Sequence, residues 1–130
     1  MSEQNSNESQ LIKTIIIEKD CFGDEIETIT YTFNRVLHRE DGPAKIVRGY
    51  RSLLEECYCH GKLHSYNDKP AIYEYRGDHF YKAWYEHGLL HRDGNKPAKI
   101  DGCGESYFVR GKYSHSLSFG NEYDEFLANY

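Results

Sequence analysis

The chain has 130 residues, of which 28% are charged and 38% are hydrophobic, and this length and composition predict one soluble globular domain. Its formal charge of -5 argues against a general phosphate-binding surface, because nonspecific nucleic-acid binding relies on Lys and Arg. No apolar run approaches the roughly 20 residues that span a bilayer, and MSEQNSNESQ at the N-terminus lacks the basic and apolar regions of a signal peptide, so we expect a cytoplasmic protein without membrane contact.

From the N-terminus, the sequence predicts a polar arm followed by β-structure. Residues 1–10 have the composition of a solvated arm. Residues 14–18, TIIIE, are typical of a strand that caps one end of a sheet. Further strands are predicted by β-rich segments that flank glycine-centred turns, among them ETITYTF, AIYEY, HFYKAWYE and ESYFV, and the 12 Tyr residues favour the same structure.

One loop sequence occurs three times between these segments. Pro43, Pro70 and Pro97 are 27 residues apart, and each is followed by Ala. A Leu-His pair precedes each proline at Leu37-His38, Leu63-His64 and Leu90-His91. The first copy has one residue fewer between His and Pro, which indicates a loop, where an insertion costs least.

Upstream of the loops, an alignment at the same interval extends the similarity. It matches Tyr31 with Tyr58 and Tyr85, and it places Asn34 in the register of Gly61 and Gly88. Asn tolerates the left-handed backbone conformation almost as Gly does, which supports that match. A fourth copy occurs at residues 108–111, which match residues 85–88, but the interval between Gly88 and Gly111 is four residues shorter than 27. If each arm of its hairpin lost two residues, the two faces would be preserved, because side chains alternate along a strand.

A period of this length, built from hairpins, predicts stacked repeats that bury their faces against their neighbours. We therefore expect a mainly β fold: an array of stacked antiparallel β-hairpin repeats of about 27 residues, in one domain over residues 11–130. The expected units are residues 14–37, 38–63, 64–90 and 91–115, with a cap at residues 116–130. In the cap, Tyr123, Phe126, Leu127 and Tyr130 at helical spacing predict a short C-terminal amphipathic helix.

The segments WYEHGLLHRDGNKPAKI and CYCHGKLHSYNDKPAIY resemble a divergent form of the MORN-type repeat, whose unit reads aromatic-Tyr-x-x-Gly-x-Leu-His-Arg-x-Asp-Gly-Pro-Ala. The resemblance covers residues 31 to 113. It departs from the pattern at Ser65 and Tyr66, where Arg and an acid are expected, and the first copy lacks the Gly before Leu-His. Arrays of this variant are frequent in proteins of large DNA viruses and phages, and the resemblance implies a hairpin array used as a scaffold or interaction surface, without an implied activity.

The recurring loop positions supply the first candidate binding residues: His38, Arg39, His64, His91 and Arg92. In one interpretation, imidazole and guanidinium donors from neighbouring loops converge on a small anionic ligand. In the other, these side chains tie their own loops through Asp or through backbone carbonyls near proline. The second interpretation is favoured, because a residue that is repeated with a fold more often serves the fold.

No set of residues indicates catalysis or a cofactor. Cys57, Cys59, His60 and His64 resemble zinc ligands in kind, but Cys57 aligns with Trp84 and Cys59 with Glu86, so we predict no metal site. The four cysteines are expected to be free thiols in a reducing compartment. Because no nucleophile, base and orienting group occur together, we expect a protein that is not an enzyme.

The central aromatic residues supply the remaining candidates, Tyr66, Trp84 and Tyr85, since exposed Tyr and Trp favour protein contacts. The favoured hypothesis is a noncatalytic scaffold or inhibitor that binds a protein, as a viral factor in the host cytoplasm if the source is viral. A binder or sponge for a small anion or nucleotide is the alternative, and an acidic nucleic-acid mimic ranks third. Open strand edges would also permit a homo-oligomer.

Overall fold

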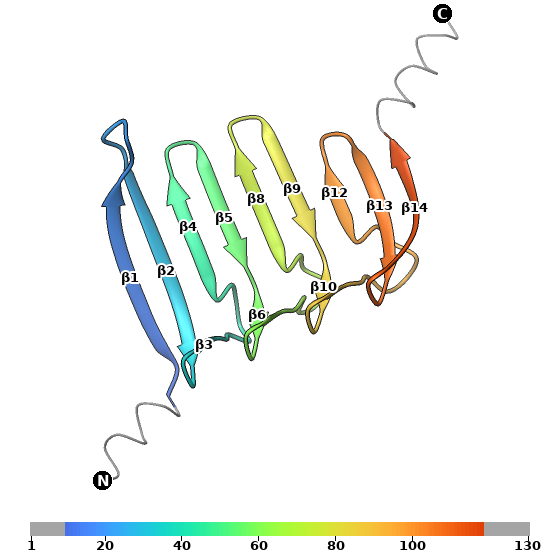
Figure 1. The fold of residues 1–130 in the computed structure, drawn as a ribbon, viewed down its shortest axis with the longest axis horizontal. Helices are drawn as coiled ribbons and strands as arrows, with labels where there is room; N and C mark the ends of the chain where they lie inside the picture. Colours follow the sequence, from blue (N-terminus) through green and yellow to red (C-terminus); the bar gives the residue numbers. More distant parts are fainter. Residues whose placement is uncertain (1–9, 119–130) are drawn as a thin grey trace, which may run out of the picture.

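The computed structural model describes residues 10–118, whose long antiparallel hairpins lie side by side in one sheet (Figure 1). The ten-stranded sheet has the order β1-β2-β4-β5-β8-β9-β12-β13-β14, with β3 paired to β2, while β6-β7 and β10-β11 form two separate two-stranded sheets. The strands are β1 (Ile12–Lys19), β2 (Glu25–Phe33), β3 (Val36–Leu37), β4 (Lys45–Gly49), β5 (Ser52–Glu56), β6 (Tyr58–Cys59), β7 (Lys62–Leu63), β8 (Ile72–Arg76), β9 (His79–Ala83), β10 (Tyr85–Glu86), β11 (Leu89–Leu90), β12 (Lys99–Asp101), β13 (Gly104–Val109) and β14 (Lys112–Ser118).

This architecture confirms the expected mainly β fold of antiparallel hairpins. The segment TIIIE lies in β1, at one edge of the sheet. The helix expected near the C-terminus lies outside the described residues, as does nearly all of the N-terminal arm. Within residues 10–118, no helix is long and apolar enough to cross a membrane.

The long hairpins share one register until the last, which is shorter. Lys45 stands opposite Glu56 in β4-β5, and Ile72 stands opposite Ala83 in β8-β9. In β12-β13 the corresponding pair is Lys99 and Ser106, so that each arm is shorter by two residues. Because side chains alternate along a strand, this shortening leaves every following side chain on its original face.

Short hairpins with two-residue turns follow the long strands at the lower ends in Figure 1. Both residues of each turn have positive φ, as type I′ turns require. The turns are Asn34-Arg35, His60-Gly61, His87-Gly88 and Arg110-Gly111. The alignment of Asn34 with Gly61 is therefore wrong by one residue, because Arg35 occupies the place of that glycine.

The same correction applies to the aromatic position upstream of each turn. The backbone N–H groups of Tyr31, Cys57 and Trp84 donate to the carbonyl oxygens of Ala44, Ala71 and Ala98. Tyr31 therefore corresponds to Cys57 and Trp84, and not to Tyr58 and Tyr85. The missing residue of the first loop shifts everything upstream of it by one position.

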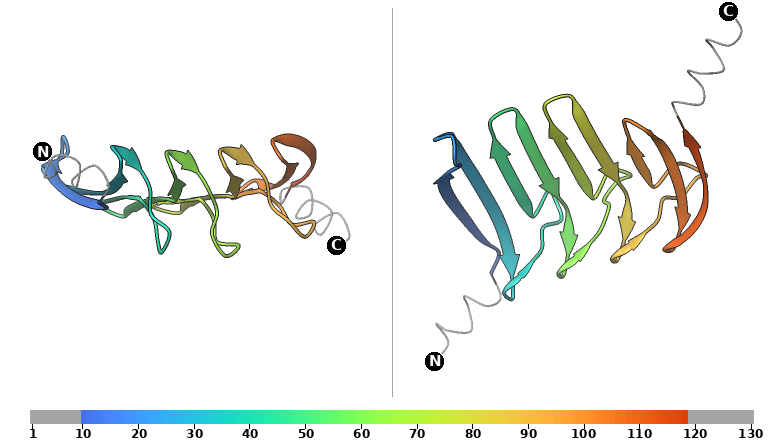
Figure 2. Two further views of the ribbon diagram at one scale, coloured as in Figure 1. Left: turned by 90° about the horizontal axis from the view of Figure 1, so that it is seen from below. Right: turned by 45° about the horizontal axis from the view of Figure 1, so that its top comes forward.

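The sheet is a single layer, seen end-on in Figure 2. No large side chain among the described residues is fully buried, and the completely buried residues are alanines: Ala44, Ala71, Ala83 and Ala98. These alanines lie where the long strands meet the loops, and their backbone groups bond to neighbouring strands. Small side chains let the backbones approach there, so hydrogen bonds between neighbours replace a thick apolar core.

A second close approach of backbones occurs where the start of β13 meets β14, and Gly104 and Gly102 offer a matched test of it. A Cβ atom at Gly104 would clash with the backbone carbonyl of Leu117, whereas a Cβ at Gly102 meets no atom within 4 Å. We expect Gly104→Ala to lower the free energy of unfolding by about 1–3 kcal/mol, and Gly102→Ala to change it by less than about 0.5 kcal/mol. Urea denaturation of both variants measures the difference, and equal effects would contradict the packing described for this turn.

Candidate functional site

Each Leu-His pair accepts both N–H groups of the turn in the next hairpin. The Leu37 carbonyl accepts from Gly61 at 2.8 Å, and His38 Nδ1 accepts from the His60 N–H at 2.9 Å. The same two bonds occur from Leu63 and His64 to the turn at His87-Gly88, and from Leu90 and His91 to the turn at Arg110-Gly111. The recurring histidines therefore join neighbouring hairpins.

This role fixes the protonation state of the histidines. Nδ1 can accept an N–H only while it carries no proton, so each ring that holds a turn is neutral, with its proton on Nε2. Burial lowers the pKa of His64, and the neighbouring His87 lowers it further, with Glu86 opposing the shift. The ring of His64 lies 4.4 Å from that of His87, and the ring of His38 stacks on that of His60 at 4.2 Å. Protonation of His64 would thus remove a bond and place a charge beside a second imidazole.

The two loop arginines bind within the structure instead of extending into solvent. Arg39 lies over the ring of Tyr31 at 4.0 Å and donates to Asp41 and to the Pro43 carbonyl. Arg92 lies over Trp84 at 3.7 Å and donates to the Pro97 carbonyl. Stacking on a ring together with bonds to a carbonyl uses both the face and the edge of the guanidinium. Arg39 therefore ties its own loop, whereas Arg92 ties its own loop through Pro97 and also bonds to Asp68 of the middle loop.

The middle loop shows why it can lack arginine. Ser65 stands at the position of Arg39 and Arg92, and Cys57 stands at the position of Tyr31 and Trp84. The cation and the ring beneath it are therefore absent together. Ser65 instead accepts the Tyr85 N–H through Oγ at 3.0 Å and donates its own N–H to the Tyr85 carbonyl.

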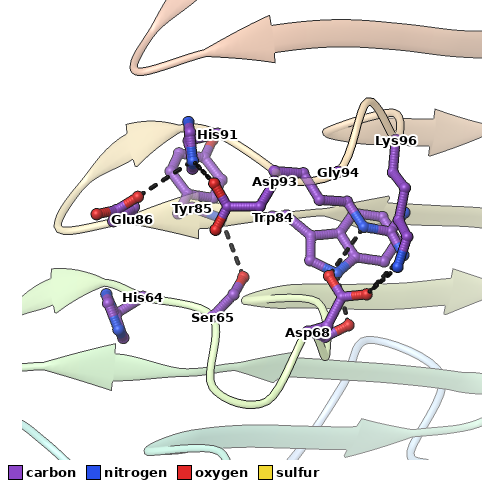
Figure 3. A pocket seen from close by; sticks show the side chains of 11 residues that line it. His64, Ser65, Asp68, Trp84, Tyr85, Glu86, His91, Asp93, Gly94 and Lys96 are labelled. Atoms are coloured by element: carbon purple, nitrogen blue, oxygen red, sulfur yellow. Dashed lines mark hydrogen bonds and ion pairs between the residues drawn. The ribbon is translucent and has the colours of Figure 1, made fainter.

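A cavity of about 450 Å³ opens beside Trp84 and Arg92 (Figure 3). Asp68 projects into it from the middle loop and accepts from Arg92 at 3.1 and 3.3 Å and from Lys96 at 2.9 Å. Hydrogen bonds from Arg92 and then Lys96 lower the pKa of Asp68 to about 2. The cavity therefore places two cations around one carboxylate, and the chain itself supplies that carboxylate.

The three candidate aromatic residues serve different contacts. Trp84 is only 5% exposed, and its Nε1 donates to the Asp68 carbonyl at 2.9 Å, so it is a structural residue of the loop junction. Tyr66 is half-buried, lies edge-on to His64 and donates to the Tyr58 carbonyl at 3.5 Å. Tyr85 is half-buried and lines the cavity. Burial raises the pKa of Tyr85, as expected for a phenol with restricted access to water.

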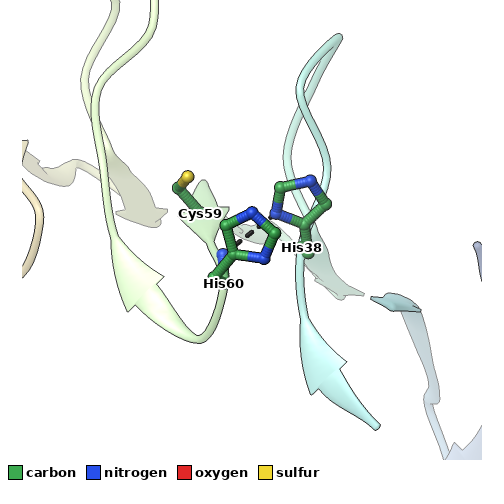
Figure 4. A group of neighbouring side chains, drawn as sticks. All are labelled: His38, Cys59 and His60. Carbon is green, nitrogen blue, oxygen red and sulfur yellow. Dashed lines mark hydrogen bonds between the residues drawn. The ribbon is translucent and has the colours of Figure 1, made fainter. Parts of the chain in front are cut away.

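His38, Cys59 and His60 are the one group of three or more metal-ligand side chains that lie close together in the described part of the chain (Figure 4). Their ligand atoms lie within 4.8 Å of one another. The two imidazoles are stacked with 22° between their planes, so their lone pairs lie in nearly parallel planes, an arrangement poorly suited to tetrahedral coordination of one ion. His38 also uses Nδ1 for the His60 N–H. Of the four zinc-like residues in the sequence, only Cys59 and His60 belong to this group, and His38 lies beside them in place of Cys57 and His64. All four cysteines are free thiols.

Three aromatic residues lie on one face of the sheet, and one of them, Tyr73, also lines a cavity with Pro43 and Pro70 of two loops. Leu53, Tyr75 and Phe80 stand directly opposite one another in β5, β8 and β9, so they share a face. Tyr73 lies two residues from Tyr75 on that face, with the two rings edge to face at 6.2 Å. Phe80 is 37% exposed. We call Leu53, Tyr73, Tyr75 and Phe80 the aromatic strip; its composition was visible in the sequence, but its shared face depends on the register.

No protein-family model matches the chain, and neither a curated protein nor a solved structure matches it.

The acceptor role of His64 predicts a pH-dependent stability. Because the folded pKa is lowered, the unfolded chain binds a proton more readily, and the His64 contribution is present above pH of about 6.5 and is lost as the pH falls through the folded pKa. We expect His64→Leu to lower the free energy of unfolding by about 0.5–1.5 kcal/mol at neutral pH, because the exposed His87 N–H exchanges its acceptor for water.

His64→Asn is the matched control, since the amide oxygen can stand in the place of Nδ1 and does not titrate. Urea denaturation at pH 7.5 and pH 5.5 compares the three proteins. The Asn variant should lose less stability than the wild type between the two pH values. Equal losses in both would contradict the role of His64.

The guanidinium contacts of Arg92 predict that lysine cannot replace it. Arg92→Lys loses the fork to Asp68, the bond to the Pro97 carbonyl and the stack on Trp84, so we expect a loss of about 1–3 kcal/mol in the free energy of unfolding. Arg76, an exposed residue with a 3.6 Å ion pair to Glu74, provides the control: Arg76→Lys should cost less than about 0.5 kcal/mol. Denaturation followed by circular dichroism measures both, and a neutral Arg92→Lys would refute this assignment.

Proposed function

We propose that the chain is a noncatalytic β-hairpin repeat protein that binds another protein through the aromatic strip of its sheet. The observation that carries the proposal is the position of the strip, on one face of a single-layer sheet. Tyr73, Tyr75 and Leu53 are half-buried, and Phe80 is exposed. Aromatic side chains that are partly exposed together on a rigid surface are the residues that most often dominate protein interfaces.

The surroundings of the strip suit a protein partner. Lys82 Nζ lies 5.8 Å from the ring centroid of Tyr73. Arg48 stands directly opposite Leu53 on the neighbouring strand and forms a 3.2 Å ion pair with Glu27. An apolar centre bordered by charges of both signs resembles the core and rim of a protein interface. The repeated loops, in turn, support the proposal that the units form a stacked array similar to the divergent MORN-type repeat, used as a scaffold or inhibitor. A role as a viral factor in a host cytoplasm belongs to the same proposal.

The small-anion alternative has less support from the geometry. Arg39 and Arg92 already bond to carbonyl oxygens and to Asp41 and Asp68, so an anion would have to displace a carboxylate of the chain. Native mass spectrometry of the purified protein tests for such a ligand directly. The nucleic-acid mimic has less support still, because acids are paired with cations along the sheet, as in Glu27-Arg48.

Photo-crosslinking tests the proposed interface. Benzoylphenylalanine in place of Phe80 lies in the strip, whereas the same group in place of Tyr81 projects from the opposite face of β9. In a lysate of the cells in which the protein naturally occurs, we expect a light-dependent adduct of one discrete mass from position 80 and none from position 81. Unlabelled wild-type protein should compete for that adduct, and unlabelled Tyr75→Asp protein should compete at least about tenfold less well.

Two results would contradict the proposal. Adducts of equal yield from both positions would show nonspecific contact, and equal competition by wild-type and Tyr75→Asp protein would show that the strip does not bind the partner. Circular dichroism of the Tyr75→Asp protein controls for its folding.

A further inference from the structure

The outer edge of β1 is a second surface, independent of the aromatic strip. β1 pairs with β2 on one side, and no strand among residues 10–118 pairs with its other side. Four isoleucines of β1 are between 44% and 60% exposed: Ile12, Ile15, Ile16 and Ile17. Because side chains alternate, these residues present apolar surface on both faces of the strand. A long apolar edge strand is a template for pairing with another strand.

The hydrogen-bond pattern shows which backbone groups this edge offers. Asp20 donates its N–H to the Asp24 carbonyl, so this pair is a hydrogen-bonded one in the β1-β2 ladder. Bonded and non-bonded pairs alternate in an antiparallel ladder, so the even-numbered residues of β1 bond to β2. The N–H and C=O groups of Lys13, Ile15 and Ile17 therefore point outward along the free edge.

The opposite edge of the sheet is built differently. The β13-β14 ladder is interrupted by a register shift between Tyr107 and Phe108. β14 has the sequence KYSHSLS, with Lys112 at its start and Ser at alternate positions. Bulges, charges and polar residues are the features by which edge strands avoid pairing. The two ends of the sheet are thus unequal within residues 10–118: β1 combines an uninterrupted ladder with a run of three exposed isoleucines, and β14 does not.

We propose that two copies of this chain pair their β1 edges antiparallel about a twofold axis at Ile15, and so form one continuous sheet. A twofold axis perpendicular to the sheet places the same face of both subunits on the same side of the joined sheet. Odd-numbered residues of one β1 strand therefore pair with odd-numbered residues of the other. Such an isologous contact closes on itself and covers both free β1 edges, whereas pairing of β1 with β14 would form an open filament.

The charges of β1 decide between the two registers in which the strands overlap most, those centred on Ile15 and on Ile16. With Ile16 on the axis, Lys13 would stand opposite Lys19 of the partner subunit, twice in each dimer, and like charges directly opposite are destabilising. With Ile15 on the axis, Lys13 stands opposite Ile17 of the partner subunit, and residues 12–18 pair without like charges. In this register Ile15 faces its own copy, and the outward backbone groups of Lys13, Ile15 and Ile17 all find partners.

Sedimentation equilibrium of the full chain tests the dimer. We expect a species of twice the 15.2 kDa chain mass, with dissociation at low concentration. Ile15→Lys places one ammonium opposite another at the axis and should raise the dissociation constant by about tenfold or more. Ile16→Lys is the matched control: Ile16 is similarly exposed but faces Thr14 of the partner subunit, so its effect should stay within about threefold.

A charge exchange separates the dimer interface from folding. Neither Ile15→Lys nor Ile15→Glu protein should dimerise well alone, but an equal mixture should form a heterodimer, because opposite charges then meet at the axis. A monomeric wild-type chain at all concentrations would overturn the proposal. Equal effects of Ile15→Lys and Ile16→Lys on the dissociation constant would also overturn it. Wild-type polymers larger than a dimer, together with no heterodimer in the mixture, would overturn it in favour of pairing between β1 and β14.

Discussion

The junction between a Leu-His pair and the next short turn is the interaction on which this sheet depends. A sheet of one layer has no second layer to pack against, so neighbouring hairpins must be held by bonds along the sheet. At each junction, a Leu carbonyl and a His Nδ1 accept the two N–H groups of a type I′ turn. Both groups of the turn are thereby satisfied, and the position of one hairpin fixes that of the next. The buried alanines beside these junctions let the backbones come close enough for the bonds to form.

The loops that follow the Leu-His pairs hold their arginines within the structure, and this limits which ligands those loops can bind. Arg39 and Arg92 each combine a ring contact with bonds to a proline carbonyl and an aspartate. Where the arginine is replaced by Ser65, the ring is replaced by Cys57, so the pair changes as a unit. Because these cations are already bonded, the loop row has few donors left for an anion. The surfaces that remain for a partner are the sheet faces and the free strand edge.

Those surfaces lie on different parts of the sheet. The aromatic strip lies on the central hairpins, where each of its strands is paired on both sides. The β1 edge lies at one end and offers backbone groups and isoleucines instead of aromatic rings. Pairing at that edge would extend the sheet without covering the strip, so the proposed dimer would present two copies of the strip and could bind a multivalent partner more tightly.

The mainly β fold and its antiparallel hairpins could be predicted from the sequence, because β-rich segments and glycine-centred turns are local signals that depend on neighbouring residues. The prediction that arginines tie their own loops did not include the bond from Arg92 to Asp68 of the middle loop. The sequence did not reveal that Arg35 adopts positive φ in the place of a glycine, so the first unit was aligned one residue out of register. The strand pairing, in contrast, sets which turn each histidine holds and which side chains share a face with Tyr75. It also places Trp84 beneath Arg92 and sets which amides of β1 point outward. Each of these depends on pairing between strands that are distant in sequence, and a register is a property of the pair of strands and not of either strand alone.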